Sequence, residues 1–592
     1  MAEGDTTAID IDVAAIEAKY AEEREKRLRA DANDQYVELR SVDGLNVDPY
    51  ADPDFARAPI SENVDVLIVG GGFAGILAAC RLRERGVTDI RIVEKGGDFG
   101  GAWYWNRYPG AACDVESYIY LPMLEETGYI PTERYAKASE IFAYARRLAE
   151  HHDLYAGALF QTEVQSARWD ESRDRWIIST SRGDAIAARF LISCAGLLTN
   201  AKLPGIPGIE NFEGHSFHTS RWDYGYTGGD QTGNLTGLSD KRVGIIGTGS
   251  TAIQAIPVIA RYAKELCVFQ RTPSAVEVRD NRPTDWNWVR SLKPGWQKER
   301  IENFTDATTG VPVAVDLVND AWTDVARIFL GSADGKPVDP EDLHLSGLRK
   351  MERIRQRVAS TVKNPTTAEA LKPYYYYMCK RPCFHDEYLD AYNRPNVTLV
   401  DTEGRGVERI TAKGAVVAGR EYPLDCLIYA TGFDWLAQYD RHSGIQVNGI
   451  GGVSLGTHWA DGARTLFGMQ TRGFPNFFLM SLIQAGTSFN YFHGADEQVK
   501  HIAYVVASCL ERGASWVQPT KQAEDGWVDE IMASAGPRRA FLEACTPGYY
   551  NFEGRRDRAN ELNDFYGGAP TEYLKQLVDW RAAGELPGLE LG

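Results

Sequence analysis

FEGHSFHTSRWD, the segment Phe212–Asp223, lies between two glycine-rich turns, and each turn follows an apolar run. Upstream, VDVLIVG ends at Gly70 and continues as GGGFAG to Gly75; downstream, KRVGIIG ends at Gly247 and continues as GTGSTA to Ala252. A strand, a glycine-rich turn and a helix in this order form a dinucleotide-binding Rossmann unit, because the glycines let the backbone approach a pyrophosphate at the helix N-terminus. The sequence therefore predicts an α/β fold with two Rossmann-like units. The predicted binding positions are Gly70, Gly72 and Gly75 in the first turn and Gly247, Thr248, Gly249, Ser250, Thr251 and Ala252 in the second.

The residues that follow the two turns in the same register differ in charge. Glu94 follows Gly75 at the spacing where a carboxylate accepts the ribose hydroxyls of a dinucleotide. Arg271 stands at the same spacing after Ala252, and a 2′-phosphate requires a cation at that place. We therefore expect FAD in the first unit and NADPH in the second, with Gln270 and Thr272 as further contacts beside Arg271.

The chain is expected to have four parts. Residues 1–60 form an N-terminal extension, with an amphipathic helix over Ile11–Ala30, that wraps the first domain. Residues 61–200 form the first part of the FAD-binding domain. The NADP-binding domain follows over residues 201–395 and carries a helical insertion at about 283–371. Residues 396–592 complete the FAD-binding domain and form the C-terminal segment.

Composition and charge exclude some classes of partner. The 592 residues are 44% hydrophobic and 25% charged, with a formal net charge of −18, which argues against nucleic acid or an anionic membrane as a partner. The acidic start lacks the basic and apolar regions of a secretory signal, so we expect a cytoplasmic protein. The uncharged run Gly473–Ala495 contains too many polar residues for a membrane span and predicts a buried segment.

The nine cysteines are scattered along the chain without a C-x-x-C pair or a Cys/His zinc spacing. We therefore expect reduced thiols in the core and no metal site. The absence of a paired redox motif also disfavours a disulfide reductase.

The central segment carries a family signature. Its residues fill the pattern F-x-G-x-x-x-H-x-x-x-W-(P/D), with Phe212, Gly214, His218, Trp222 and Asp223 at the fixed positions. The chain thereby resembles the type I Baeyer–Villiger monooxygenases from about Val64 to about Asn551. The resemblance implies that NADPH reduces FAD, that a C4a-peroxyflavin forms with O2, and that one oxygen atom is inserted next to the carbonyl of a ketone to give a lactone or ester.

The same resemblance implies roles for further residues. Arg381, in the KRP step, would be the permanent cation at the reacting centre, with Asp114 as its orienting carboxylate. Lys380 would contact the phosphate of NADPH. The positions implied to border the flavin cofactor are Ala102, Trp103, Tyr104, Trp105, Asp114, Tyr120 and Val164.

Two residues of the signature have a structural interpretation. A single His near a strand end is most often structural, so we assign His218 to coupling between the domains, not to general-base chemistry. Trp222 is interpreted as a packing anchor.

Two alternative functions stay open. An N- or S-oxygenating flavoprotein would share both nucleotide sites, although Arg381 and the Trp222-Asp223 end favour ketone oxidation. A non-catalytic FAD-binding module would not need the second glycine-rich turn.

The identity of the ketone is suggested by two segments. The long N-terminal extension and CTPGYYN (Cys545–Asn551) resemble the subgroup that acts on large-ring and steroid ketones. SLIQAG (Ser481–Gly486) replaces the Gly-Pro-Gly-rich loop that is common in the family. We expect a bulky ketone and O2 as substrates, and the sequence leaves a homo-oligomer open.

Overall fold

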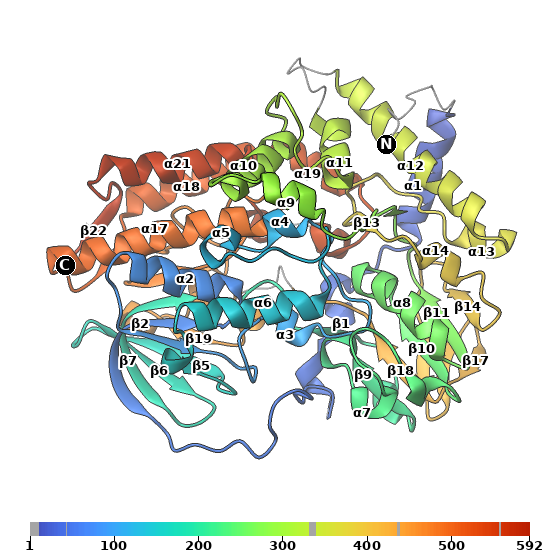
Figure 1. Ribbon diagram of the computed structural model, residues 1–592, viewed down its shortest axis with the longest axis horizontal. Coiled ribbons are helices and arrows are strands. Elements are labelled where there is room, and N and C mark those ends of the chain that lie inside the picture. The colour runs from blue at the N-terminus through green and yellow to red at the C-terminus, as the bar shows by residue number, and fades with distance from the viewer. Residues whose placement is uncertain (1–10, 43, 331–338, 435–438, 556–557) are drawn as a thin grey trace.

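The chain folds around two sheets that form two lobes side by side (Figure 1). The structure is a computed structural model and describes residues 11–42, 44–330, 339–434, 439–555 and 558–592. The first ten residues of the acidic start therefore lie outside the described residues. In each lobe, the glycine-rich turn lies at the carboxyl edge of a parallel strand, where ligands bind in sheets of this class.

The first sheet has eight strands and contains the upstream turn. Its central strand β2 (Ser61–Val69) pairs in parallel with β3 (Ile90–Val93), with Val69 opposite Val93. Because these two residues are paired, Gly70 and Glu94 leave the sheet together at the same edge. The other strands are β4 (Ala158–Leu159), β5 (Val164–Asp170), β6 (Arg175–Thr180), β7 (Ala185–Ser193), β19 (Gln446–Asn448) and β20 (Phe477–Leu479).

The second sheet has five parallel strands in the order β14-β11-β10-β18-β9. Ile246, the last residue of β10, pairs with Phe269 on one side and Tyr429 on the other. The turn that begins at Gly247 therefore opens between two neighbouring strand ends. The bounds are β9 (His215–His218), β10 (Arg242–Ile246), β11 (Glu265–Gln270), β14 (Val397–Asp401) and β18 (Cys426–Tyr429).

The expected domain boundary at residue 396 is wrong. β14 and β18 both follow residue 396, yet they pair with β11 and β10 of the second sheet. The first sheet is joined again only at β19, which pairs with β5. An apolar strand sequence does not specify which sheet the strand joins, so the C-terminal boundary could not be read from the pattern.

The helices of both turns are buried against their sheets. α2 (Phe73–Glu84) follows the first turn and packs on α17 (Tyr491–Arg512). α8 (Ser250–Tyr262) follows the second turn and carries Pro257 within it. Apolar residues from α2, α17 and β2 share the largest core cluster, whereas α8 and β10 form a second cluster.

The described residues of the segment 283–371, which are 283–330 and 339–371, form helices joined by short loops. They are α9 (Trp286–Ser291), α10 (Trp296–Thr309), α11 (Ala321–Leu330), α12 (Pro340–Thr361) and α13 (Pro365–Ala370). Beside them, the short strands β12 (Val276–Glu277) and β13 (Cys383–Phe384) pair in parallel and hold the segment that carries Arg381.

The N-terminal extension was predicted to wrap the first domain. Its helix instead packs on the second lobe. α1 (Val13–Glu25) lies beside α12 (Figure 1), and Arg355 Nη1 donates a hydrogen bond to the Tyr20 hydroxyl at 3.0 Å. β1 (Tyr36–Glu38) pairs antiparallel with β8 (Lys202–Pro204). The later part of the extension contacts the first lobe, where the Tyr104 hydroxyl donates to Asp48 and Arg57 pairs with Asp184 at 2.5 Å.

The C-terminal segment adds further helices and contributes residues such as Phe541 and Tyr549 to the wall of the cavity described below. Its helices are α18 (Lys521–Ser534), α19 (Gly536–Ala544), α20 (Arg558–Leu562) and α21 (Pro570–Ala583), and β21 (Val517–Pro519) pairs with β22 (Leu589–Leu591). The remaining helices are α3 (Ala102–Trp105), α4 (Ser117–Tyr120), α5 (Leu124–Thr127), α6 (Ala138–His151), α7 (Tyr224–Thr227), α14 (Tyr388–Ala391), α15 (Tyr439–Ser443) and α16 (Leu455–His458). The strands β15 (Arg409–Thr411), β16 (Gly414–Val417) and β17 (Arg420–Pro423) form a separate three-stranded antiparallel sheet.

The prediction that all cysteines are reduced is wrong for one pair. Cys379 and Cys545 form a disulfide with an S–S distance of 2.03 Å and a sequence separation of 166 residues. Their proximity comes from the docking of the C-terminal segment on the segment before Arg381, which no local spacing shows. The other seven cysteines are free, and all except the half-buried Cys267 are buried.

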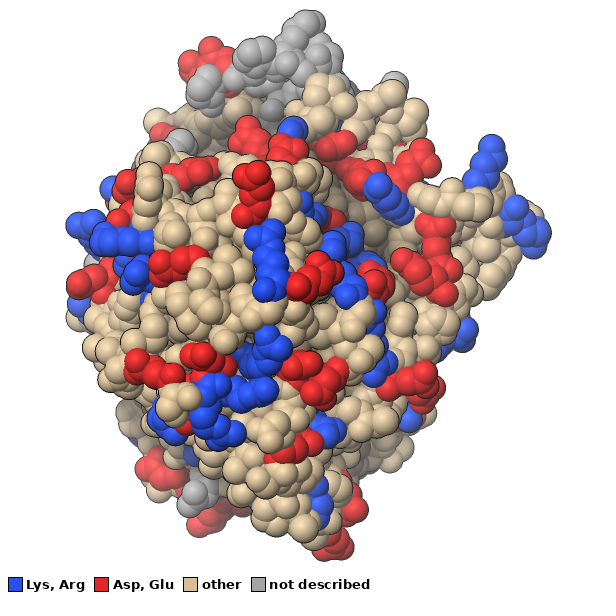
Figure 2. All heavy atoms as spheres, turned by 90° about the vertical axis from the view of Figure 1, so that its left-hand side faces the viewer, with Lys and Arg blue, Asp and Glu red and all other residues tan. Residues whose placement is uncertain are grey.

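The structure can be compared with the expectations about charge and membrane spans. On the face shown in Figure 2, acidic and basic side chains are interspersed, without a broad basic area. Within the described residues, no helix is both long enough and apolar enough to cross a membrane. The uncharged run 473–495 contains β20 and the start of α17, and its Asn476 and Gln484 are fully buried with hydrogen-bond partners.

Candidate functional site

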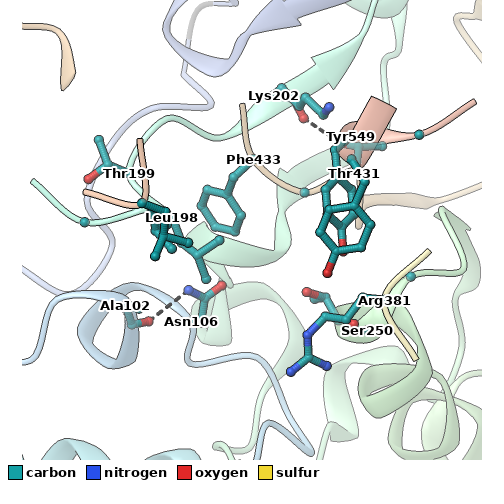
Figure 3. A pocket seen from close by; sticks show the side chains of 18 of the residues that line it. Ala102, Asn106, Leu198, Thr199, Lys202, Ser250, Arg381, Thr431, Phe433 and Tyr549 are labelled. Atoms are coloured by element: carbon teal, nitrogen blue, oxygen red, sulfur yellow. Dashed lines mark hydrogen bonds between the residues drawn. The ribbon is translucent and has the colours of Figure 1, made fainter. Parts of the chain in front are cut away.

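A cavity of about 1540 Å³ extends from the first glycine-rich turn to the second. Figure 3 shows Arg381 and Ser250 together at one end of the view, below Tyr549, and Asn106 and Leu198 at the other. The predicted positions that line the cavity are Gly70, Gly72, Glu94, Ala102, Trp103, Trp105, Asp114, Tyr120, Val164, Gly247, Thr248, Gly249, Ser250, Thr251, Arg271, Thr272, Lys380 and Arg381. The fold thus places both glycine-rich turns, Lys380 and Arg381 around the same cavity.

The first turn is shaped by close backbone contacts. Gly70 has φ +104°, and a Cβ at Gly75 would lie 1.9 Å from the Gly70 carbonyl oxygen. Gly75 therefore serves the packing of α2 against the turn and does not line the cavity. The Glu94 carboxylate accepts hydrogen bonds from the backbone N–H groups of Gly71 and Gly96, both at 2.6 Å, and burial raises the pKa of Glu94.

The aromatic loop after the first unit borders the cavity only in part. Trp103 Nε1 donates to the Tyr120 hydroxyl at 3.0 Å, and both side chains line the cavity. Tyr104 differs from the expectation, because its ring is buried against Gly96 and its hydroxyl donates to Asp48 at 2.8 Å. That orientation turns the Tyr104 side chain away from the cavity.

The second turn leaves space for a ligand. Gly247 has φ +116°, and a Cβ there would lie 2.4 Å from the Ala430 carbonyl oxygen. A Cβ at Gly249 would meet no atom within 4 Å, so the space opposite this glycine is open. Ala252 is buried in α8 and does not line the cavity. Neither does Gln270, since its side-chain amide donates to the Ala370 carbonyl at 2.7 Å.

Arg271 lies in the cavity wall among polar groups from distant parts of the chain. Its Nη1 donates to Gln35 Oε1 at 2.5 Å, and its Nη2 donates to the Tyr36 hydroxyl at 3.1 Å and to Glu553 Oε2 at 3.2 Å. Thr272 also lines the cavity, and its hydroxyl accepts a hydrogen bond from Arg27 Nε at 3.0 Å. These hydrogen bonds therefore fix the orientation of the Arg271 guanidinium in the cavity wall.

Arg381 and Asp114 form a bidentate ion pair. Arg381 Nη1 and Nη2 donate to the two carboxylate oxygens of Asp114 at 2.5 and 2.9 Å. Burial alone would lower the pKa of Arg381. The charge and hydrogen bonds of Asp114 outweigh this effect, so the pKa lies above its ordinary value. Trp322 fixes the pair, because its Nε1 donates to the Asp114 backbone oxygen at 2.8 Å and its ring lies 5.1 Å from the guanidinium.

The five signature residues lie outside the cavity lining. Burial lowers the pKa of His218 to about 3, and its Nδ1 accepts from the Ser220 N–H at 3.1 Å, so its imidazole is neutral and caps a turn. Trp222 is fully buried and Asp223 caps α7. A Cβ at Gly214 would lie 2.5 Å from the ring of Phe212.

Several residues of the cavity wall were not predicted. Trp322 comes from the helical insertion, Tyr36 from the N-terminal extension and Lys202 from the link between the units. Tyr549 and Glu553 come from the C-terminal segment. Only the CTPGYYN run gave a signal for this group, because the others reach the cavity through tertiary contacts.

The described residues contain no cluster of three or more His, Cys, Asp or Glu side chains that could hold a metal ion.

Comparison with known proteins identifies the family. A sequence profile of the pyridine nucleotide-disulphide oxidoreductases matches residues 67–315. A Baeyer–Villiger monooxygenase of Stachybotrys chlorohalonatus is 48% identical, over 98% of this chain and 95% of the relative. This chain belongs to the Baeyer–Villiger monooxygenases. The family membership confirms the predicted fold class, and the chain is an FAD- and NADPH-dependent monooxygenase that uses a ketone and O2.

Solved structures of Baeyer–Villiger monooxygenases share the fold. The polycyclic ketone monooxygenase of Thermothelomyces thermophila has a TM-score of 0.91 and 38% identity, covering 98% of this chain and 99% of that chain. The OTEMO complex with FAD and NADP has a TM-score of 0.76 and 30% identity, covering 90% of this chain and all of that chain.

Proposed function

We propose that this chain oxidises a bulky cyclic or polycyclic ketone to a lactone or ester, with Arg381 and Asp114 at the reacting centre. The observation that carries the proposal is their bidentate ion pair, which lies in the same cavity as both glycine-rich turns. A cation fixed between two dinucleotide sites suits oxygen insertion at a carbonyl, because negative charge develops on the reacting oxygen atoms.

The first part of the cavity fits FAD. The N-terminus of α2 and the backbone of Gly70 and Gly72 face the cavity, where a pyrophosphate would meet unpaired N–H groups. Glu94 stands at the strand end beside them and would accept the ribose hydroxyls. The further residues that would hold FAD are Ala102, Trp103, Trp105, Asp114, Tyr120 and Val164.

The second part fits NADPH. Gly249 leaves open space at the N-terminus of α8, and Arg271 lies in the cavity wall as a permanent cation for the 2′-phosphate. Thr272 and Lys380 would add a hydroxyl and a second cation. The backbone of Gly247, Thr248, Ser250 and Thr251 would surround the pyrophosphate.

Arg381 would stabilise the charge that the reaction develops. FAD, reduced by NADPH, supplies the activated oxygen atom when both cofactors are bound. The Arg381 guanidinium remains protonated throughout, because Asp114 raises its pKa and arginine does not lose its proton in proteins. Asp114 and Trp322 hold the guanidinium in place, so its donors need not reorganise when charge develops.

The size of the ketone is supported by the cavity and by the solved relatives. Aromatic side chains from three separate segments, Trp322, Phe489 and Tyr549, line the cavity near Arg381. Trp322 and Phe489 are stacked with ring centroids 4.4 Å apart and would offer an apolar wall to a ring system. The relative with a TM-score of 0.91 is named a polycyclic ketone monooxygenase.

The alternative, oxygenation of nitrogen or sulfur, is less well supported. Such a reaction keeps its oxygen donor protonated and does not need a permanent cation beside it. The Arg381–Asp114 pair and the family membership both favour ketone oxidation.

We further propose a cytoplasmic location. The Cys379–Cys545 disulfide is uncommon for that compartment. Cell fractionation with an antibody to the chain would decide between the cytoplasm and an oxidising compartment.

Replacing Arg381 by Ala tests the catalytic assignment. We expect the variant to keep its flavin absorbance spectrum and its reduction by NADPH, and to lose at least about a hundredfold in ester formation, because a preorganised charge contact is removed. Arg353→Ala, an exposed arginine on α12, is the matched control. Ester formation by Arg381→Ala at the rate of the wild type would move the catalytic role to another residue.

A further inference from the structure

The Arg271 site contains a buried carboxylate. Glu553 is only 4% exposed, and its two oxygens lie 3.2 Å from Arg271 Nη2 and 3.2 Å from the Tyr36 hydroxyl. Lys202 and Lys380 also line this part of the cavity, and together with Arg271 they lower the pKa of Glu553 against the effect of burial. The carboxylate is therefore ionised, and Arg271 and the two lysines stabilise its negative charge.

The C-terminal segment fixes Glu553 in this position. The Glu553 N–H donates to the Gly548 carbonyl at 2.8 Å, and both Phe552 and Glu553 have positive φ values, of 52° and 56°. Asn551 stabilises the bend, because its Oδ1 accepts from the N–H of Gly548 at 2.9 Å and of Gly554 at 3.2 Å. Non-glycine residues adopt this conformation only where their surroundings impose it.

The segment is also fixed at its start. Cys545 is bonded to Cys379, which directly precedes Lys380, and Lys380 Nζ donates to the Pro547 carbonyl at 2.7 Å. These bonds fix the backbone before Glu553, and the Gly554 N–H bond to Asn551 fixes the bend that contains it, so the carboxylate is held close to Arg271.

We propose that Glu553 is a specificity-determining residue, a built-in anion that competes with the 2′-phosphate of the nicotinamide cofactor for Arg271. The inference rests on the proposed role of Arg271. A dianionic phosphate would meet the guanidinium of Arg271 and the protonated fraction of Lys202 and Lys380, but also the negative charge of Glu553. Removing the charge of Glu553 therefore makes the site more attractive to the phosphate. Glu553 thus weakens the hold on the 2′-phosphate and favours the release of NADP⁺, while leaving the rest of the dinucleotide unaffected.

The experiment isolates the 2′-phosphate. Adenosine 2′,5′-bisphosphate and 5′-AMP differ only in that group, so the ratio of their dissociation constants, measured by calorimetry on the FAD-loaded enzyme, reports its contribution. Glu553→Gln keeps the shape and one acceptor for Arg271 but removes the charge. We expect this variant to bind the bisphosphate about tenfold more tightly and 5′-AMP unchanged, because a like charge next to the phosphate is removed.

Two further variants make the result unambiguous. Arg271→Ala should reduce the ratio, and if it does not, the proposed phosphate site itself is wrong. If Arg271→Ala reduces the ratio and Glu553→Gln leaves it unchanged or lowers it, only the role of Glu553 is overturned. Glu163→Gln removes a cavity carboxylate next to Val164 on the FAD side and should leave the ratio unchanged.

Glu553→Asp provides a second test if the glutamine variant does not fold. It keeps the charge but shortens the side chain by one methylene, which moves the carboxylate away from Arg271. A smaller gain in the same direction is expected, and a loss of bisphosphate affinity would contradict the proposal.

Discussion

Lys380 directly precedes Arg381 in the sequence, and its charge is sensitive to pH. Burial lowers the pKa of Lys380, Glu553 opposes this effect, and Arg271, Arg27 and Lys202 add to it, so that the pKa is about 7. At neutral pH the ammonium group is therefore partly deprotonated. Its neighbour Arg381 remains charged, so two adjacent residues of one turn differ in how their charge responds to pH.

This difference predicts how cofactor affinity depends on pH. Lys380 carries its proton below a pH of about 7, and only the charged form attracts a 2′-phosphate. Affinity for adenosine 2′,5′-bisphosphate relative to 5′-AMP should thus fall as pH rises from about 6.5 to about 8.5, where the phosphate stays dianionic. Bound phosphate raises the pKa of Lys380 and therefore moves this fall in relative affinity to higher pH.

Calorimetry at several pH values measures the relative affinity, and Lys380→Met should make it nearly independent of pH. A rise in relative affinity with pH in the wild type would contradict the role of Lys380.

At the level of elements, the disulfide connects the C-terminal segment to the turn that carries Arg381. Cys379 is two residues before Arg381, and Cys545 is four residues before Tyr549, which lines the same cavity. The bond therefore keeps the aromatic wall near the reacting centre.

Removing the disulfide should affect both stability and coupling. Closing a loop of this length constrains the unfolded chain by about 5 kcal/mol in the chain-entropy description, and measured losses are about 2–5 kcal/mol. We expect Cys545→Ser to lower the free energy of unfolding within this range and to oxidise more NADPH per ketone converted, whereas reduction of FAD by NADPH continues. Denaturant unfolding and the ratio of product to NADPH consumed are the measurements. Cys267→Ser, at a half-buried free cysteine, is the control. Equal stability and coupling in both variants would show that the bond has no such role.

Element order and strand register explain why part of the site was predictable. Glu94 and Arg271 follow glycine turns at a fixed spacing, and that spacing is preserved because neighbouring parallel strands end together, as Val69 with Val93 and Ile246 with Phe269. Glu553 lies 282 residues after Arg271, so their contact depends on how the C-terminal segment docks. The domain assignment of β14 and β18 was wrong for the same reason, because the sheet that a strand joins depends on tertiary contacts.

The whole molecule is organised around one cavity between two lobes, and its size leads to a prediction about the substrate. Burying hydrocarbon contributes about 0.8 kcal/mol per CH₂, which corresponds to roughly fourfold in affinity for each methylene. Across a series of cyclic ketones, kcat/KM should rise from six-membered toward twelve-membered rings and fused polycycles. Gas chromatography of the products with NADPH in excess measures the series. A maximum at cyclohexanone, without turnover of larger rings, would show that the space near Arg381 is small.

The central claim, that this chain inserts an oxygen atom from O2 beside the carbonyl of a bulky ketone, is tested most directly by isotope labelling. The FAD-loaded enzyme is supplied with NADPH, a fused polycyclic ketone and heavy-oxygen-labelled O2, and the product is analysed by mass spectrometry. The account predicts a lactone that contains one labelled oxygen atom, located in the ring, with the carbonyl oxygen unlabelled. Recovery of unchanged ketone while NADPH is consumed, or a product that carries the label as a hydroxyl group on a ring carbon, would contradict it.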